Sequence, residues 1–354
     1  MVILSKKIFI SDCEGPLTLN DNAFEICSEF IQDGNKFFKI LSNYDDYLVD
    51  IVKKEDYNAG NTLKFIIPFL KAENITNQDL INFSKNNIFI VNDAKKTLSY
   101  IKNTMDSFIV STSYTQYIQA VCDYFNFSFE NTFYTFIDID GFKLNDYEIK
   151  KLKKIKDIII TLDLDKKEDI KCLDKIFFEI FPKMSFYEYY SKIETTGGSG
   201  KEKAIYKILS RYDDNTEVFY IGDSITDVEP LKFVKNNNGI SVSFNGNIYS
   251  LNAAEIAIIS SSTLPTAILS NIFYNYDKNE VINFINDYNK SSSIKNLANK
   301  YNLNSKISKD FIELLNSGKK PIIDIINEDN KEKLLNNSSK MRDGIRGKDI
   351  GNLG

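Results

Sequence analysis

Short apolar runs recur along the chain, and several of them end just before a polar residue. The three clearest runs precede Asp12, Ser111 and Asp223 and span residues 8–10, 108–110 and 218–221. Apolar runs of this length, bounded by Gly, Asp or Ser, are typical of buried parallel strands. Because ligands of open α/β sheets bind at the carboxyl ends of the strands, the pattern predicts that these side chains meet in one crevice.

Helical and strand-like patterns alternate through the same part of the chain. Helices are predicted over residues 94–104, 115–125 and 201–211, and further strands over residues 240–244 and 257–260. Alternation of this kind is typical of an α/β fold built on a parallel sheet. We therefore expect residues 1–20 and 88–278 to form one α/β core.

Four segments depart from this alternation. Residues 21–87 have apolar positions at helical spacing and few strand-like runs, which predicts a helical insertion. Residues 132–195 exceed what a minimal core needs, and we expect a second insertion or an extended flap there. The polar character of residues 279–335, with modest apolar content, predicts a C-terminal extension made of helices. Residues 336–354 are charged and rich in Asn and Gly, which predicts a flexible tail.

The longest uncharged run, residues 256–276, is long enough to suggest a transmembrane helix. It contains a Ser-Ser-Ser-Thr stretch at residues 260–263 and Pro265, which favour a strand, a polar turn and a helix of the core. Residues 1–7 lack the apolar region and the cleavage site of a signal peptide. We therefore expect no transmembrane segment and a cytoplasmic location.

Composition narrows the possible chemistry. The chain has 354 residues, of which 43% are hydrophobic, enough for a sizeable core and for two or three domains. It contains no His, which excludes Ser-His-Asp triads and His-ligated zinc sites. The net charge of −5 gives no basic footprint for nucleic acid. No two of the four cysteines have the CxxC spacing of a metal site, and scattered cysteines suit a reducing cytosol.

Carboxylates at the ends of the predicted strands are the strongest candidates for chemistry. Asp12 and Glu14 follow the first strand, and Asp223 and Asp227 follow a later one. Clustered carboxylates bind Mg²⁺, and an Asp can attack phosphorus to form an aspartyl-phosphate. Each residue also has an ordinary alternative role, because Asp is common in turns after strands and at helix N-termini.

Four motifs occur in an order that resembles the haloacid dehalogenase superfamily of phosphohydrolases. They are Asp12 in SDCEGP, Ser111, Lys201 and the GDSITD segment at residues 222–227. The phosphoserine-phosphatase-like branch is the most similar. The resemblance implies an α/β, three-layer, Rossmann-like parallel sheet, with residues 21–87 as a helical cap inserted after the first strand. It also implies a Mg²⁺-dependent phosphatase that acts on a small phosphorylated metabolite through an aspartyl-phosphate.

The resemblance implies a role for each residue around the phosphoryl group. Asp12 would be the nucleophile, and Lys201 would neutralise charge on Asp12 and on the phosphoryl oxygens. Ser111 would donate a hydrogen bond to those oxygens. Thr112 and Ser113 compete with Ser111 for this assignment, because the register at a strand end is not fixed by sequence.

The implied metal ligands are Asp12 and Asp223, with the main-chain carbonyl of Glu14, while Asp227 would bind through water or brace Lys201. Glu14 departs from the family pattern, in which its position is usually an Asp that serves as general acid and then as general base. The carboxyl of Glu14 is competent for the same role. Its extra methylene displaces the proton donor by about 1.5 Å, and a misplacement near 1 Å can cost roughly 100-fold in rate.

Two other acidic segments also follow apolar runs. They are DIDG at residues 138–141 and LDLD at residues 162–165. Neither leaves enough chain before Lys201 for both a cap and a Ser/Thr strand. We therefore assign the first motif to Asp12 and expect both segments to be strand ends within the second insertion.

A further resemblance favours a function without catalysis. The segments SDCEGPLTLNDNAFE (residues 11–25) and SFNGNIY (residues 243–249) are similar to the archaeal proteins called subunit R of energy-converting hydrogenase A. This implies an accessory or regulatory protein on the same fold, associated with a membrane hydrogenase. A Glu14 carboxyl that points at the phosphate position would favour catalysis, and one bonded elsewhere would favour the accessory role.

Overall fold

A computed structural model describes residues 5–55, 57–290, 293–351 and 353 of the chain. Within this part a seven-stranded sheet forms, in which only the last strand pairs antiparallel to its neighbour. In spatial order the strands are β3 (Thr132–Thr135), β2 (Asp106–Tyr114), β1 (Lys7–Ser11), β4 (Glu217–Gly222), β5 (Ile240–Phe244), β6 (Ile256–Ile259) and β7 (Ile322–Ile325). The chain order reverses at β1, which lies between β2 and β4. A crevice for ligands is therefore expected at the carboxyl ends of β1 and β4.

The sheet is buried on both faces, which explains the continuous apolar character of its strands. Ile8 and Ile10 of β1 pack on one face, whereas Phe9 between them packs on the other. The helices of the first face are α10 (Ser199–Leu209), α11 (Val228–Asn236) and α12 (Ile248–Ala253). Those of the second face are α5 (Ala94–Lys102), α6 (Thr115–Phe125) and α13 (Leu264–Asn275). The expected α/β architecture with a mostly parallel sheet is confirmed.

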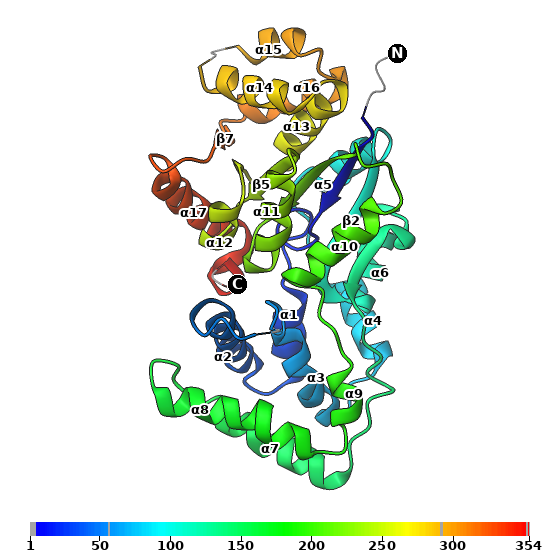
Figure 1. Cartoon of the computed structure of the whole chain (residues 1–354), viewed down its shortest axis with the longest axis vertical. Coiled ribbons are helices and arrows are strands. Elements are labelled where there is room, and N and C mark those ends of the chain that lie inside the picture. Colours follow the sequence, from blue (N-terminus) through cyan, green and yellow to red (C-terminus); the bar gives the residue numbers. More distant parts are fainter. Residues whose placement is uncertain (1–4, 56, 291–292, 352, 354) are drawn as a thin grey trace.

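A second core lies below the sheet in Figure 1 and consists of helices from two distant segments. We call it the helical body, residues 22–86 and 137–193. Its first segment contains α1 (Asn22–Phe30), α2 (Gly34–Asp46), η1 (Tyr47–Ile51), α3 (Thr62–Ala72) and α4 (Asn77–Asn86). Its second contains α7 (Asp146–Ile159), α8 (Lys167–Lys175), η3 (Ile176–Ile180), η4 (Phe181–Lys183) and α9 (Tyr187–Ser191). A short η2 (Phe129–Asn131) precedes β3.

Aromatic contacts join the two segments of the helical body. Phe65 of α3 stacks on Phe177 of η3 with ring centroids 4.1 Å apart, and Phe69 packs against Phe181. The second segment is therefore not a separate flap. The expectation that residues 162–165 end a strand is wrong. The apolar run before them is the end of helix α7, whose Leu152, Ile155 and Ile159 are buried along one face, and the segment follows that helix.

The C-terminal helices pack on the core through α13. They are α14 (Lys278–Lys290), α15 (Ile294–Lys300) and α16 (Ser305–Asn316), and their apolar positions extend the core cluster around α13. Among the described residues, no helix combines the length and the apolar character needed to cross a membrane. The run over residues 256–276 forms β6 and α13, as expected.

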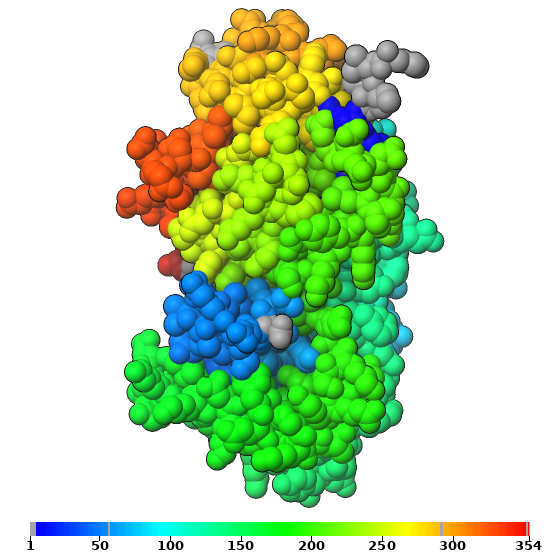
Figure 2. Space-filling model, in the orientation of Figure 1, coloured from blue at the N-terminus to red at the C-terminus, as the bar shows by residue number. Residues whose placement is uncertain are grey.

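The last helix, α17 (Lys331–Gly351), corrects the expectation of a flexible tail. Leu334 is buried against the core, and the hydroxyl of Ser338 donates to the carbonyl of Gly246 at 2.6 Å. Gly347 breaks the helix with φ at 77°, a value that favours glycine. Beyond it, Ile350 and Leu353 pack in the helical body. The red C-terminal segment in Figures 1 and 2 thus links the core to the helical body.

Candidate functional site

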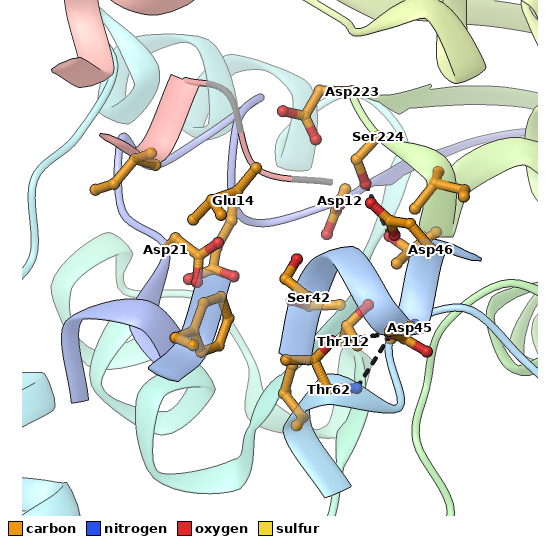
Figure 3. A pocket seen from close by; sticks show the side chains of 18 of the residues that line it. Asp12, Glu14, Asp21, Ser42, Asp45, Asp46, Thr62, Thr112, Asp223 and Ser224 are labelled. Carbon is orange, nitrogen blue, oxygen red and sulfur yellow. Dashed lines mark hydrogen bonds between the residues drawn. The ribbon is translucent and has the colours of Figure 1, made fainter. Parts of the chain in front are cut away.

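A cavity lies where the carboxyl ends of β1, β2 and β4 face the helical body and α17 (Figure 3). Its polar lining comes from all three parts of the molecule. The lining includes Asp12, Glu14, Asp21, Ser42, Asp45, Asp46, Ser111, Thr112, Asp223, Ser224, Arg342 and Arg346. The structure therefore brings together strand ends that are about 200 residues apart in sequence, as the pattern of apolar runs predicts.

The loops after β1 and β4 are fixed against each other at the base of the cavity. The main-chain N–H of Asp12 donates to the carbonyl of Ile221 at 2.9 Å, and Asp12 Oδ1 accepts from the N–H of Cys13 at 2.6 Å. Gly15 has φ at 94°, and a Cβ atom there would lie 2.3 Å from Cγ of Asp223. Only glycine allows this approach, which places Asp12 and Asp223 side by side.

Lys201 is completely buried between two carboxylates. Its Nζ lies 2.7 Å from Oδ2 of Asp12 and 2.7 Å from Oδ1 of Asp227. Burial favours the neutral amine, but the two carboxylate charges outweigh it and raise the pKa of Lys201 above its ordinary value. Helix α10, which begins two residues earlier, sets the position of this side chain.

Asp227 serves as the structural anchor of the network. Besides Lys201, it accepts hydrogen bonds from the Tyr220 hydroxyl at 2.7 Å and from the main-chain N–H groups of Asp223 and Ser224 at 3.0 and 3.1 Å. Burial would raise the pKa of Asp227, but Lys201 and these donors lower it below the ordinary value. Asp227 is therefore the carboxylate whose charge the fold stabilises.

Asp12 carries the charge that the fold does not fully compensate. Burial raises the pKa of Asp12 well above its ordinary value, and the nearby charges of Asp227 and Asp223 raise it further, against the lowering effect of Lys201. One lysine between two carboxylates leaves a negative charge in excess. A further cation beside Asp12 would lower its pKa and favour the ionised form.

Three carboxylates present an oxygen to a common space. One oxygen from each of Asp12, Asp223 and Asp227 lies within 4.8 Å of the others, and all three residues are buried. Oxygen donors of this kind are the ligands that Mg²⁺ prefers. Oδ2 of Asp223 is engaged by Nη1 of Arg342 at 2.7 Å and by Nη1 of Arg346 at 3.1 Å.

Glu14 faces the helical body as well as the cavity. Its Oε1 accepts from the main-chain N–H of Asn22, the first residue of α1, at 2.6 Å. Figure 3 shows the carboxyl groups of Glu14 and Asp21 next to each other. Burial, followed by the charge of Asp21, raises the pKa of Glu14 well above its ordinary value. Adjacent buried carboxyls of this kind favour a protonated member.

Ser111 and Thr112 both reach the cavity, but their hydroxyl groups differ in their bonds. The Ser111 hydroxyl donates to Oγ of Ser113 at 3.1 Å and accepts from the main-chain N–H of Ser113. Oγ1 of Thr112 is buried and has no hydrogen-bond partner among the described residues. An unpartnered buried hydroxyl has a free energy cost that a bound ligand can remove.

The competing acidic segment at residues 138–141 belongs to another part of the structure. Oδ1 of Asp138 accepts from Nδ2 of Asn77 at 2.6 Å and from the main-chain N–H of Asp140. Asp138 is not among the residues that line the described cavity. Its carboxylate fixes the connection between β3 and the helical body.

Sequence reasoning missed the two arginines of α17. The chain contains three arginines, Arg211, Arg342 and Arg346, among 44 cationic residues. In a chain that otherwise uses lysine, an arginine marks a position where a planar, multidentate donor is needed. The sequence signal that could have indicated their role is the presence of two arginines, four residues apart, in a segment expected to be flexible.

Asp45 and Asp46 at the end of α2 were also missed. Asp45 accepts from the Tyr57 hydroxyl at 2.7 Å, from the main-chain N–H of Gly60 at 2.9 Å and from the Thr62 hydroxyl at 3.0 Å. It thereby fixes the loop that closes the cavity on this side. Burial, against these donors, raises the pKa of Asp45 to about 6.

Replacing Asp46 by Asn is expected to stabilise the protein at alkaline pH. Burial, with the charges of Asp45 and Asp50, raises the pKa of Asp46 to about 7. When folding raises the pKa of a carboxyl, the folded protein loses stability as pH rises from the pKa of the unfolded state to the pKa of the folded state. We expect a gain on the order of 1 kcal/mol in urea unfolding at about pH 8 and a smaller gain at about pH 5.

The exposed neighbour Asp50 provides the matched control for this prediction. Asp50→Asn should change the free energy of unfolding less than Asp46→Asn at the alkaline pH. An Asp46→Asn effect of equal size at both pH values would contradict the assignment.

Comparisons with known proteins support the fold over the whole chain. No family model and no curated protein matches the chain. Among solved structures it is similar to gene product AF1437 from Archaeoglobus fulgidus, with 26% sequence identity, a TM-score of 0.83 and 99% of each chain covered. It also aligns with a phosphoserine phosphohydrolase-like protein from Francisella tularensis subsp. tularensis SCHU S4, at 18% identity and a TM-score of 0.38, over 68% of this chain and 87% of that chain. The first similarity shows that this architecture, over nearly its full length, recurs in an archaeal protein.

Proposed function

We propose that the protein is a Mg²⁺-dependent phosphomonoesterase of the haloacid dehalogenase superfamily. The observation that carries the proposal is the contact of buried Lys201 with both Asp12 and Asp227, at 2.7 Å each, beside Asp223 and the cavity. The order of these motifs along the chain matches the superfamily. The position of the site at the carboxyl ends of β1 and β4 is where such sheets bind ligands.

The residues present fit a divalent cation. Asp12 and Asp223 would hold Mg²⁺ through their carboxylates, and Asp227 would brace Lys201. The bound ion would supply positive charge against the phosphoryl oxygens and against Asp12. The excess negative charge at Asp12 supports this assignment, because an added cation would favour the ionised form that a nucleophile needs.

Asp12 would attack phosphorus and form an aspartyl-phosphate while the bond from phosphorus to the leaving alcohol breaks and Glu14 protonates the departing oxygen. A water molecule, deprotonated by Glu14, would then hydrolyse the aspartyl-phosphate, which releases inorganic phosphate and restores Asp12. Lys201 holds Oδ2 of Asp12 in place and would neutralise charge that develops on the phosphoryl group. Thr112, whose hydroxyl lacks a partner, is the stronger of the two candidates for a hydrogen bond to the phosphoryl oxygens. Ser111 would position the strand end through its bonds to Ser113.

The helical body would act as the cap over this site. Helix α2 and the loop at residues 57–60, which is hydrogen-bonded to Asp45, close one side of the cavity. Glu14 and Asp21 lie where the cap meets the core. Closure of this kind excludes water during the first step and selects the substrate. A phosphatase screen over a panel of small phosphorylated metabolites, with Mg²⁺ present, tests the proposal. Hydrolysis of at least one member is the expected result.

Glu14→Gln is expected to lower the turnover number by roughly 100-fold or more, because an amide cannot transfer a proton. Burial and the charge of Asp21 raise the pKa of Glu14, which favours the protonated carboxyl that a general acid needs. Glu14→Asp should preserve activity, since it restores the length usual in the superfamily. The measurement is the steady-state rate of aryl phosphate hydrolysis over a range of pH. Rates for Gln that equal those of the parent at every pH would show that Glu14 transfers no proton.

A second candidate function is that of an accessory or regulatory protein that binds a phosphorylated ligand without turnover. The observation that favours it is the hydrogen bond from the N–H of Asn22 to Glu14, which holds the carboxyl toward α1. Association with a membrane hydrogenase, implied by the sequence resemblance, remains a proposal. Binding of a phosphate analogue, with no hydrolysis of any phosphate ester tested, would favour this candidate.

A further inference from the structure

Two arginines of α17 occupy the side of the site where a divalent cation would bind. The side chains of Arg342 and Arg346 are 4% and 7% exposed, and both contact Oδ2 of Asp223. Neither residue belongs to the motifs that suggest a phosphatase. Both line the cavity together with Asp12 and Asp223.

The two guanidinium groups have different surroundings. Arg342 is bound by carbonyls of the C-terminal segment, with Nε donating to Gly351 at 2.9 Å and Nη2 to Leu353 at 3.2 Å, and Nη1 also donates to Asn245 at 3.1 Å. These bonds fold the end of the chain around its side chain. Arg342 is therefore a structural anchor of α17.

Arg346 spans the two loops that form the site. Nε donates to the carbonyl of Leu19 at 3.0 Å, Nη2 donates to the carbonyl of Asn20 at 2.5 Å, and Nη1 contacts Asp223. A guanidinium group has five N–H donors, so these three contacts leave donors for a ligand in the cavity. Planar guanidinium groups bind phosphate oxygens through two parallel hydrogen bonds.

Side-chain cations are distributed unevenly at the site, because two guanidinium groups contact Asp223 whereas Asp12 and Asp227 share one lysine. Three carboxylates, Asp12, Asp223 and Asp227, contact three cationic groups, Lys201, Arg342 and Arg346. A divalent cation added beside Asp223 would lie close to two guanidinium charges and would compete with them for the carboxylate. A phosphate anion added with the cation removes this conflict, because it offers the guanidinium groups a second negative partner.

We propose that Arg346 is an anion-binding residue of this site and that, without an anion, its pairing with Asp223 weakens the binding of a divalent cation. The inference rests on the proposed function, since it takes the same carboxylates as the cation site. The further claim is that the divalent cation and phosphate bind cooperatively. The coupling is reciprocal, so each ligand raises the affinity for the other by the same factor.

Isothermal titration of the full chain with Mg²⁺, with and without inorganic phosphate, tests the inference at equilibrium. For the parent we expect weak Mg²⁺ binding that becomes at least about fivefold tighter in phosphate. For Arg346→Gln we expect Mg²⁺ alone to bind at least about fivefold more tightly than in the parent, with most of the phosphate effect lost.

Two variants serve as controls. Arg211→Gln removes a guanidinium group that packs over Phe108 and Phe133, outside the cavity, and should behave as the parent. Arg346→Lys keeps the charge and should gain less Mg²⁺ affinity than Arg346→Gln. If Arg346→Gln does not fold, Arg346→Met removes the same charge and repeats the test.

The possible outcomes separate this inference from the proposed function. Mg²⁺ binding that is equal in the parent and in Arg346→Gln, or a phosphate effect that persists in Arg346→Gln, overturns the inference and leaves the phosphatase proposal standing. A gain in Arg346→Lys as large as in Arg346→Gln also overturns it, because charge would not be the cause. Absence of Mg²⁺ binding in every variant, with or without phosphate, overturns both.

Discussion

Asp12→Asn is expected to reduce phosphate release by roughly 10⁴-fold or more, because the amide cannot serve as the nucleophile. The same change should leave the fold intact. Burial raises the pKa of Asp12 well above its ordinary value, so the charged carboxylate is less favourable in the folded protein than in the unfolded chain. Removing that charge leaves Lys201 paired with Asp227. We therefore expect a melting temperature equal to or above that of the parent.

Asp138→Asn is the control for this prediction. Asp138 lies in the competing acidic segment and bonds to Asn77 rather than to the cavity. Activity should be close to that of the parent. An inactive Asp138→Asn variant together with an active Asp12→Asn variant would show that the first motif has been assigned to the wrong aspartate.

Lys201→Met is expected to lower both activity and stability. The substitution leaves Asp12 and Asp227 buried without their common cation, and breaking a buried ion pair in this way typically costs about 3–5 kcal/mol. Phosphate release should fall as well, because no other side-chain cation contacts Asp12 among the described residues. The measurements are urea unfolding at neutral pH and hydrolysis of an aryl phosphate.

Two further variants make the result specific. Lys203 is exposed on the same helix, so Lys203→Met should be close to the parent in both measurements. Adding Asp12→Asn to Lys201→Met removes one of the two uncompensated charges and should recover part of the lost stability. Equal stability of Lys201→Met and Lys203→Met would contradict the ion-pair network.

Much of the core could be predicted because the signals are local. The strands are short apolar runs buried on both faces. Asp12 and Asp223 directly follow β1 and β4, whereas Ser111 lies inside β2, which continues to Tyr114. The order of these residues along the chain, together with Lys201, was sufficient to place them at one end of the sheet. The helices predicted over residues 94–104 and 115–125 begin at the expected residues.

The helical body shows where local signals fail. Residues 21–87 were expected to be helical, but nothing in their periodicity indicates that residues 137–193 share their core. The contact of Phe65 with Phe177 joins residues more than 100 positions apart. The strand β7 was missed for a related reason, since it is a four-residue edge strand that only pairing with β6 defines.

The C-terminal segment shows a different limit. Its composition is polar, and few apolar residues anchor α17, with Leu334 at one end and Leu353 near the other. Hydrogen bonds and ion pairs made by Arg342 and Arg346 hold the segment in place, and their partners lie in distant loops. A composition that predicts flexibility in isolation therefore forms an ordered wall of the cavity.

Phosphate release from an aryl phosphate, measured on the full chain with Mg²⁺ and then with excess chelator, tests the central proposal most directly. The buried carboxylates Asp12, Asp223 and Asp227 predict hydrolysis with Mg²⁺, its loss in chelator and its return when Mg²⁺ is restored in excess. Hydrolysis at the same rate in excess chelator would contradict the metal-dependent mechanism.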